Sequence, residues 1–206
     1  MKKFNMKQGS EDWFSIRAGK PSASQFSNIC TTKGEATKGA TREKLINSLV
    51  AEFLSGQKTE SYSSAAMERG VELESEAADF FAFRHDMELE EVGFITDDDE
   101  TFGCSPDRLI ISGTDVPTGL EIKCPLPHTQ IEYLMSDKLP TAYIQQVQGS
   151  MLVTGYSQWY FMSYCPNLPP LIKLIKKDEE FCMKLHRQIL VVLKEMKEKI
   201  EFIESL

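Results

Sequence analysis

The sequence predicts a mixed α/β domain in which helices cover a central β-sheet. Two observations support this fold class. Apolar residues recur at helical spacing towards both ends of the chain, whereas short segments typical of β-strands occupy its middle. The chain also has no repeat with a period of about 20 to 50 residues and no linker rich in proline or serine. We therefore expect residues 1–206 to form a single domain.

The N-terminal part is predicted to begin with two helices. Ser10 can cap a short first helix, which has Glu11 and Asp12 in its first turn. A polar loop over residues 31–40, which we expect to be disordered, precedes a second helix that begins near Thr41.

A third predicted helix, from about Ser64 to Arg84, has a carboxylate among its apolar residues. Its stripe at i, i+3 and i+4 spacing consists of Met67, Gly70, Val71, Glu74, Ala77, Ala78 and Phe81. A carboxylate on the buried side of a helix is costly unless it is paired or binds a cation. Glu74 is therefore a candidate site residue.

The rest of the chain predicts strands followed by helices. A small meander is expected from four strands, at residues 91–96, 102–104, 108–112 and 119–124. The later elements are a helix at 140–153, two strands at 158–165 and 171–176, and a long amphipathic helix at 178–203.

The net charge of −8 argues against binding of nucleic acid by general electrostatics, but the charge is unevenly distributed. Residues 1–50 carry nine basic and four acidic side chains (+5), residues 51–121 carry four and eighteen (−14), and residues 122–206 carry ten and nine (+1). The acidic block is either a solvated face or a set of carboxylates gathered around a divalent cation.

The five cysteines are scattered and include no C-x-x-C pair, which argues against a disulfide framework, a zinc ribbon or an iron–sulfur cluster. No apolar run reaches the roughly 18 residues that cross a bilayer, and the N-terminal residues lack the apolar stretch of a signal peptide. We expect a cytoplasmic protein without membrane contacts.

Three polar side chains are predicted to converge at the last hairpin of the meander. Asp107 begins one strand, and the two-residue period of the returning strand puts Glu121 and Lys123 on one face. Two carboxylates suit Mg²⁺ or Mn²⁺, and a lysine beside such a cation can act on an attacking water. This combination is typical of phosphodiester hydrolysis.

A simpler interpretation is that Glu121 and Lys123 line a solvated strand face and pair with each other, which is worth under about 1 kcal/mol. The bare pattern favours this interpretation, because such spacing arises often by chance. The inward Glu74 and the later run Gln145-Gln146-Val147-Gln148 favour a functional site, because the simpler interpretation leaves them unexplained.

Pro106-Asp107 with Glu121-Ile122-Lys123 resembles the PD-(D/E)xK nuclease signature, and further blocks are similar to the lambda exonuclease type, the YqaJ-like viral recombinases. These blocks follow the family's order over nearly the whole chain: Trp13 to Gly19 with Ser22-Ala23-Ser24; Gly70 with Glu74 and Ala77; Cys104 to Asp107; Gly119 to Pro125; and Ala142 to Met151. The resemblance implies a restriction-endonuclease-like core. This chain departs from the pattern at Arg108, where a small residue is common, and in its short segment ahead of Trp13.

For the catalytic centre, the resemblance implies that Asp107 and Glu121 are metal ligands, together with the main-chain carbonyl of Ile122. It implies that Lys123 acts on the nucleophilic water and that Glu74 supports the metal site. The implied cofactor is Mg²⁺, with Mn²⁺ as a possible substitute and two ions per site.

The resemblance also assigns residues around the substrate. Gln146 would lie beside the scissile phosphate, although Gln145 and Gln148 compete for this role. Arg17 and Ser24 match positions that hold a terminal 5′-phosphate, which suits a guanidinium fork and a hydroxyl.

Two of the substrate positions have alternative interpretations. Arg17 could instead form a surface ion pair with Glu11 or Asp12. Trp13 could be either a core residue or a platform on which a base stacks.

The function implied is a 5′-to-3′ exodeoxyribonuclease that digests one strand of duplex DNA from its end and leaves a 3′ tail for phage-type recombination. A homotrimeric ring and a single-strand annealing partner are implied as well, in a bacterial or phage-infected host. An endonuclease, or a nuclease of opposite polarity, would use the same metal site without a 5′-phosphate pocket. A non-catalytic module that binds DNA ends would not need Asp107, Glu121 and Lys123 together.

Overall fold

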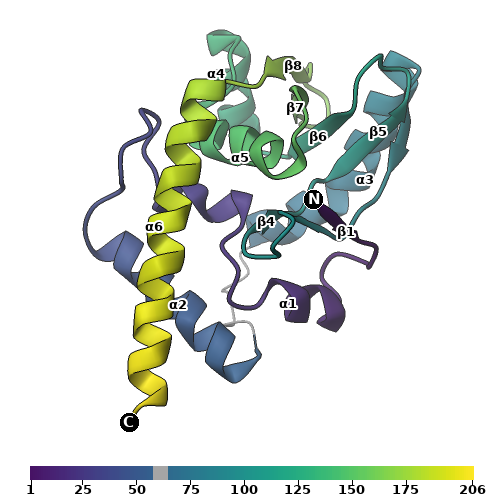
Figure 1. Cartoon of the computed structure of the whole chain (residues 1–206). Helices are drawn as coiled ribbons and strands as arrows, with labels where there is room; N and C mark the ends of the chain where they lie inside the picture. The colour runs from purple at the N-terminus through teal and green to yellow at the C-terminus, as the bar shows by residue number, and fades with distance from the viewer. Residues whose placement is uncertain (58–64) are drawn as a thin grey trace.

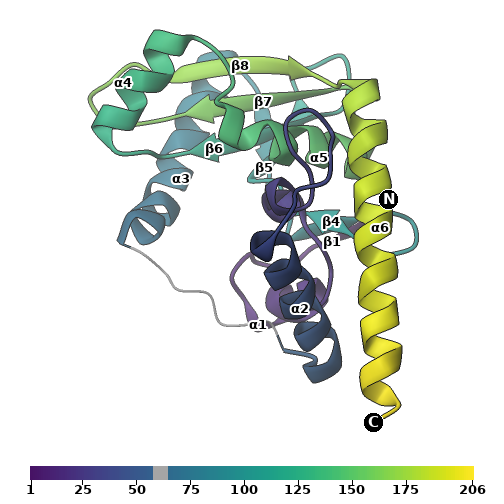
Figure 2. The ribbon, with the colours of Figure 1, turned by 90° about the vertical axis from the view of Figure 1, so that its left-hand side faces the viewer.

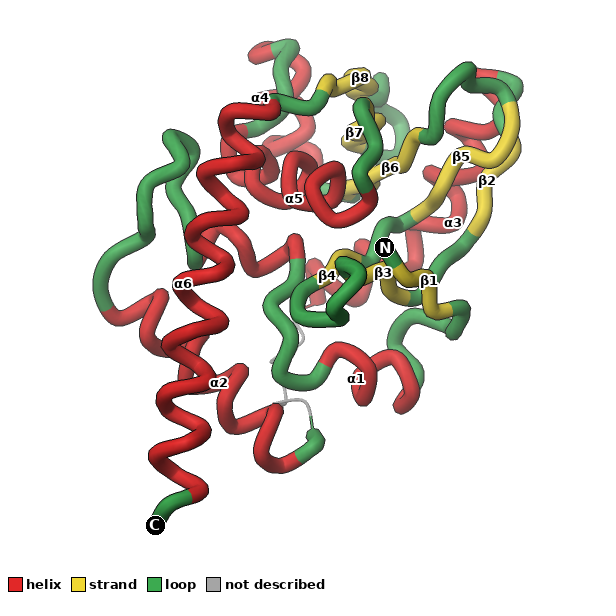
Figure 3. The backbone as a smooth tube through the Cα atoms, in the orientation of Figure 1, coloured by secondary structure: helices red, strands yellow, loops and turns green. Residues whose placement is uncertain are grey.

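A five-stranded mixed sheet forms the centre of the fold in the computed structural model, which describes residues 1–57 and 65–206. Its strands lie in the order β2-β5-β6-β7-β8, and only β6 and β7 run parallel. Their bounds are β2 (Glu88–Glu90), β5 (Arg108–Ser112), β6 (Thr118–Lys123), β7 (Gln158–Ser163) and β8 (Leu171–Lys176). A smaller sheet has the order β1-β3-β4, with β1 (Lys2–Phe4), β3 (Phe94–Thr96) and β4 (Gly103–Cys104). Figure 3 shows these three short strands as a group apart from the central sheet.

Helices pack on both faces of the central sheet (Figures 1 and 2). Their bounds are α1 (Glu11–Arg17), α2 (Ala40–Ser55), α3 (Ala65–His85), α4 (Pro127–Ser136), α5 (Ile144–Thr154) and α6 (Glu179–Glu204). Short 3-10 helices span Ala23–Asn28 and Thr141–Tyr143. Helix α3 covers the face that presents Leu120, Ile122 and Met162, whereas α5 and α6 share a core with Leu109, Trp159 and Phe161. The predicted fold class, a mixed sheet flanked by helices, is therefore confirmed.

Several predicted elements agree closely with the structure. Helix α1 is capped as expected, because the Ser10 hydroxyl accepts a hydrogen bond from the Trp13 backbone N–H. Strand β8 has the predicted bounds, and α6 buries Leu185, Ile189 and Val192. On α3, Ala77 and Phe81 are buried as predicted. The predicted start at Ser64, and the side chains of Met67 and Val71, lie outside what the structure describes.

The predicted four-strand meander is wrong. Only Phe94–Thr96 of the expected strand 91–96 forms a strand, β3, which pairs with β1 in the smaller sheet, whereas the preceding β2 (Glu88–Glu90) pairs with β5 in the central sheet. Gly93 lies at the break, where a Cβ atom would come within 2.5 Å of the Met6 carbonyl oxygen. The close approach of the N-terminal segment therefore redirects the chain. This contact joins residues far apart in sequence and leaves no local pattern.

Two other expectations need correction. Residues 31–40 are an ordered loop rather than a disordered one, since the Thr31 N–H donates to the Glu35 carbonyl (2.8 Å) and the Thr37 N–H to the Ile29 carbonyl (2.9 Å). Helix α4 was not predicted, because its large apolar side chains Ile131 and Met135 are exposed and form no buried stripe. No helix in the described ranges is both long and apolar enough to cross a bilayer.

Candidate active site

The register of β5 and β6 brings Asp107 and Glu121 to one face of the sheet. Arg108 pairs with Leu120, so the next position along each strand places Asp107 opposite Glu121. Directly opposed residues share a face, and successive residues alternate. Arg108 therefore points to the α3 side together with Leu120, and Glu121 points to the opposite side. Asp107 immediately precedes β5, where its charge also acts on Glu74 of α3.

Asp107 is fixed by the backbone of β6. The Ile122 N–H donates to Asp107 Oδ2 at 2.5 Å, because the β5–β6 ladder ends at Arg108 and leaves this edge of β6 free. The next carbonyl, that of Lys123, points the other way and accepts from the Tyr164 N–H (2.8 Å). Since successive strand carbonyls alternate, the Ile122 carbonyl points towards the side where Asp107 lies.

Glu121 is almost completely buried, with 1% of its side chain exposed. Its Oε1 accepts hydrogen bonds from Lys123 Nζ and from Gln146 Nε2, the latter at 2.5 Å. Its Oε2 is buried without a partner. Burial, followed by the nearby Asp107 charge, raises the pKa of Glu121 to about 8 in spite of the Lys123 ammonium.

Lys123 is half-buried and lies among negative groups. Burial alone would lower its pKa, but Glu121 and Asp107 outweigh burial, and the net shift is upward. Its Nζ also lies 5.5 Å from the centre of the Tyr143 ring. Lys123 is therefore an ammonium that partly balances the two carboxylates.

Glu74 faces this cluster from α3, with 32% of its side chain exposed. Arg108 Nη1 lies 2.9 Å from Glu74 Oε1, and Arg108 Nη2 lies 3.1 Å from Glu91 Oε1. Burial and the Asp107 charge raise the pKa of Glu74, whereas Arg108 opposes the rise. The structure thus places Glu74 at the site, where Arg108 holds it through contacts that the sequence did not predict.

Among the three glutamines that compete for one role, Gln146 is the one beside the carboxylates. Gln145 Nε2 donates to the Cys30 carbonyl (2.9 Å) and Gln148 Nε2 to the Lys176 carbonyl (3.0 Å). Both of these side chains lie in the interior under α5, whereas Gln146 bonds Glu121.

Three oxygen donors fit a divalent cation. A carboxylate oxygen of Asp107, the unpartnered Oε2 of Glu121 and the main-chain carbonyl of Ile122 form a set of hard ligands, which is what Mg²⁺ binds. The described residues contain no group of three or more His, Cys, Asp or Glu side chains arranged to hold a metal ion. A cation at this site would be held by the carboxylate pair and the backbone carbonyl.

Arg17 lies in a second group of polar side chains, which is joined to the carboxylates through the segment that holds Ser105, and 7% of the residue is exposed. Its Nη1 donates to Ser105 Oγ (2.6 Å) and its Nη2 to Ser22 Oγ (3.1 Å), while its Nε is buried without a partner. Burial lowers the pKa of Arg17 to about 10. The alternative of an exposed surface ion pair is thus wrong, because the guanidinium is buried against two hydroxyls.

Trp13 and Ser24 border the pocket of Arg17. The Arg17 guanidinium carbon lies 4.2 Å from the centre of the Trp13 ring, and Trp13 Nε1 donates to Ser105 Oγ at 3.1 Å. Trp13 thus covers the arginine. Ser24 is exposed, with its Oγ 3.3 Å from Ser22 Oγ.

Four contacting residues were missed by sequence reasoning: Ser22, Ser105, Arg69 and Arg108. The two serines belong to the matching blocks quoted above but were given no role there. Arg69 Nη1 donates to the carbonyls of Cys124 (3.2 Å) and Pro125 (3.1 Å), and nothing in its local pattern indicates this.

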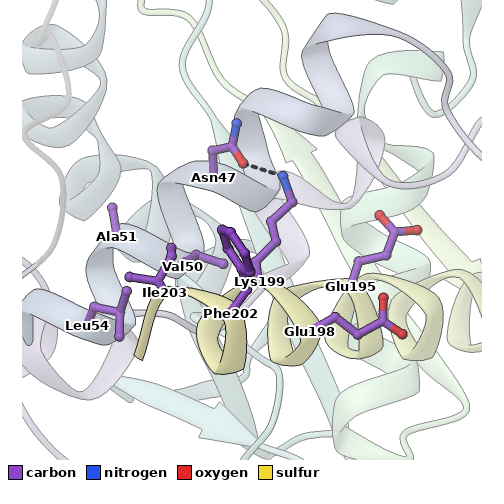
Figure 4. A pocket seen from close by; sticks show the side chains of 9 residues that line it. All are labelled: Asn47, Val50, Ala51, Leu54, Glu195, Glu198, Lys199, Phe202 and Ile203. Carbon is purple, nitrogen blue, oxygen red and sulfur yellow. Dashed lines mark hydrogen bonds between the residues drawn. The ribbon is translucent and has the colours of Figure 1, made fainter. Parts of the chain in front are cut away.

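The hollow between α2 and the end of α6 is separate from these residues (Figure 4). It encloses about 660 Å³, and its lining includes Val50, Leu54, Phe202 and Ile203. Its lining contains no candidate site residue.

Comparison with known proteins gives both a family and structural relatives. The chain matches the YqaJ-like viral recombinase domain over residues 12–157. It is similar to the structure of an alkaline exonuclease (LHK-Exo) from Laribacter hongkongensis, with 31% sequence identity and a TM-score of 0.84. The match covers 95% of this chain and 97% of that chain. The structure of that enzyme in complex with dAMP matches equally well. A phage-related exonuclease from Haemophilus somnus 129PT shares the fold, with 16% identity, 89% and 96% coverage and a TM-score of 0.70. None of the curated proteins matches.

Proposed function

This chain belongs to the YqaJ-like viral recombinase domain family, and from that premise we propose that it is a metal-dependent 5′-to-3′ exodeoxyribonuclease. Family membership and the likeness to an alkaline exonuclease support a phage-type exonuclease. One observation carries the finer proposal, which is the buried Glu121, with its unpartnered Oε2, beside the half-buried Asp107 and Lys123. A second carboxylate next to a buried one is unfavourable unless cations balance both, and such perturbed groups are typical of functional sites.

Asp107, Glu121 and the Ile122 carbonyl would hold Mg²⁺, or Mn²⁺ in its place. When bound, the cation supplies charge stabilisation at the phosphorus oxygens and lowers the pKa of water. Gln146 donates to Glu121 and fixes the carboxylate orientation, so that Oε2 is free to ligate. Lys123, which is an ammonium in this structure, would donate a hydrogen bond from Nζ to the attacking water and so orient it.

The Arg17 pocket supports recognition of a terminal 5′-phosphate. A guanidinium whose Nε has no partner, with three serine hydroxyls close by, is a ready set of donors for phosphate oxygens. Trp13 keeps the guanidinium in place by covering it. In this proposal Ser24, the most exposed of the three serines, meets the phosphate first.

Digestion of end-labelled linear duplexes tests the function. We expect nucleotides to be released from the 5′ end in Mg²⁺, faster with a 5′-phosphate than with a 5′-hydroxyl, and no release in EDTA. Cleavage of circular duplex would identify an endonuclease, and release from the 3′ end would reverse the polarity. Binding of DNA ends without any metal-dependent digestion would identify a non-catalytic module.

We further propose that the enzyme is a homotrimeric ring that passes its 3′-tailed product to a single-strand annealing protein. A chain of net charge −8 holds DNA poorly by general electrostatics, so enclosure of the duplex is an alternative way to remain bound. Exposed Leu54, Phe202 and Ile203, which line the hollow of Figure 4, give an apolar surface for subunit contact.

Light scattering during gel filtration should give about 70 kDa, three times the 23.4 kDa chain. A monomer or dimer at micromolar concentration that still digests long duplexes without dissociating would exclude the ring.

A further inference from the structure

Arg108 is unusually well anchored for an arginine next to a cluster of carboxylates. Only 12% of its side chain is exposed. Besides its ion pairs with Glu74 (2.9 Å) and Glu91 (3.1 Å), its Nη1 donates to the carbonyl of Asp107 at 2.5 Å. The β5–β6 register fixes the side of the sheet from which it approaches, because Arg108 pairs with Leu120 and faces α3. The guanidinium is therefore a fixed charge at this position.

The charges around the cluster are mostly negative when all groups are ionised. Four carboxylates, those of Glu74, Asp107, Glu121 and the largely exposed Glu91, outnumber the basic side chains Arg108, Lys123 and Arg69. Without Arg108 the cluster would be more negative by one charge, and Glu74 would lack its ion-pair partner.

A second cation at Glu74 would have to displace the guanidinium or lie against it. Repulsion between like charges at contact distance is large in a partly buried site. Among the described residues, no three or more acidic, histidine or cysteine side chains are arranged to hold a metal ion. This agrees with the pairing of Glu74 with Arg108 rather than with a cation.

We propose that Arg108 is a positioning residue that takes the place of a second cation: it keeps Glu74 in an ion pair and limits the Asp107–Glu121 site to one divalent ion per chain. This inference rests on the proposed metal dependence and departs from the two ions that the family resemblance implies.

Counting bound Mn²⁺ on the full chain without DNA, by calorimetry and by loss of the free-ion paramagnetic resonance signal, tests the proposal. We expect one ion per chain for the wild type and for Arg108→Lys, which keeps a positive charge. Arg108→Gln should bind two, because it releases Glu74. The double variant Arg108→Gln with Glu74→Gln should return to one.

The matched control is Arg84→Gln, which removes an arginine of the same helix as Glu74 and should leave one ion bound. Two ions on the wild type, or one ion on a folded Arg108→Gln, would overturn the role of Arg108 while leaving a metal-dependent nuclease intact. No ion on the wild type would instead overturn the metal site itself, and the inference with it. Two ions on the wild type would overturn the proposal even if Arg108→Gln fails to fold.

Discussion

Binding of a divalent cation to the carboxylate pair should release a proton at neutral pH. The metal-free pair retains a proton because Glu121, with 1% of its side chain exposed, has a pKa raised to about 8 by burial and by Asp107. A carboxyl group must be ionised to ligate a cation, so binding expels this proton.

The amount released follows from the pKa. A group with a pKa of about 8 is about nine tenths protonated at pH 7 and about one tenth protonated at pH 9. We therefore expect about 0.9 proton released per cation at pH 7 and about 0.1 at pH 9. Lys123 does not contribute in this range, because its pKa is raised and it remains an ammonium in the metal-free chain.

Calorimetric titration with Mg²⁺ or Mn²⁺ in buffers of different ionisation enthalpy measures the release, since the slope of the observed enthalpy counts protons. Glu121→Gln should bind the cation weakly and release none at either pH. Arg17→Ala, which lies in the neighbouring pocket, should behave like the wild type. Equal proton release at pH 7 and pH 9, or no release at pH 7, would show that the metal-free pair does not retain a proton and that burial does not raise the pKa of Glu121 as argued.

Three further predictions concern stability and activity. In EDTA the raised pKa of Glu121 stabilises the folded chain fully below pH 4.5, and this stabilisation is lost as the pH rises through 8. The free energy of unfolding should therefore fall by about 3 kcal/mol between pH 4.5 and 7. Chemical denaturation measures this fall, and an equally steep fall with pH in Glu121→Gln would contradict the prediction. Asp107→Ala, Glu121→Ala and Lys123→Ala should each abolish digestion in Mg²⁺ while leaving the circular dichroism spectrum intact, and retained digestion would remove that residue from the mechanism. Arg17→Ala should slow digestion from 5′-phosphorylated ends far more than from 5′-hydroxyl ends, and equal slowing of both would exclude the phosphate contact.

The part of the site that the sequence predicts is the part built by local geometry. Glu121 and Lys123 share a strand, where the two-residue period alone puts them on one face, and the hairpin brings back Asp107 only 14 positions earlier. The helical period likewise places Glu74 with the buried residues of α3. Short-range periodicity and one turn are sufficient for these four residues.

What the sequence does not predict are contacts between distant segments. Arg17 meets Ser105 across 88 positions, and Arg108 meets Glu74 across 34. The pairing of β1 with β3 joins residues at least 90 positions apart. Such contacts depend on how whole elements pack, which no local period encodes. Arg108 illustrates the difference, since the sequence shows it only as a departure from a family pattern and the packed structure gives it three partners.

The placement of Ser105 links the two halves of the proposed mechanism. Its hydroxyl receives hydrogen bonds from both Arg17 and Trp13, and it lies two residues before Asp107 on the same backbone segment. The pocket proposed for the terminal phosphate is therefore joined rigidly to the carboxylate pair proposed to act on the next phosphodiester. A phosphate held at Arg17 would thus set the position of the scissile bond by a fixed protein distance rather than by recognition of base sequence. This arrangement favours stepwise removal of nucleotides from an end, because each cleavage creates a new 5′ terminus for the same pocket.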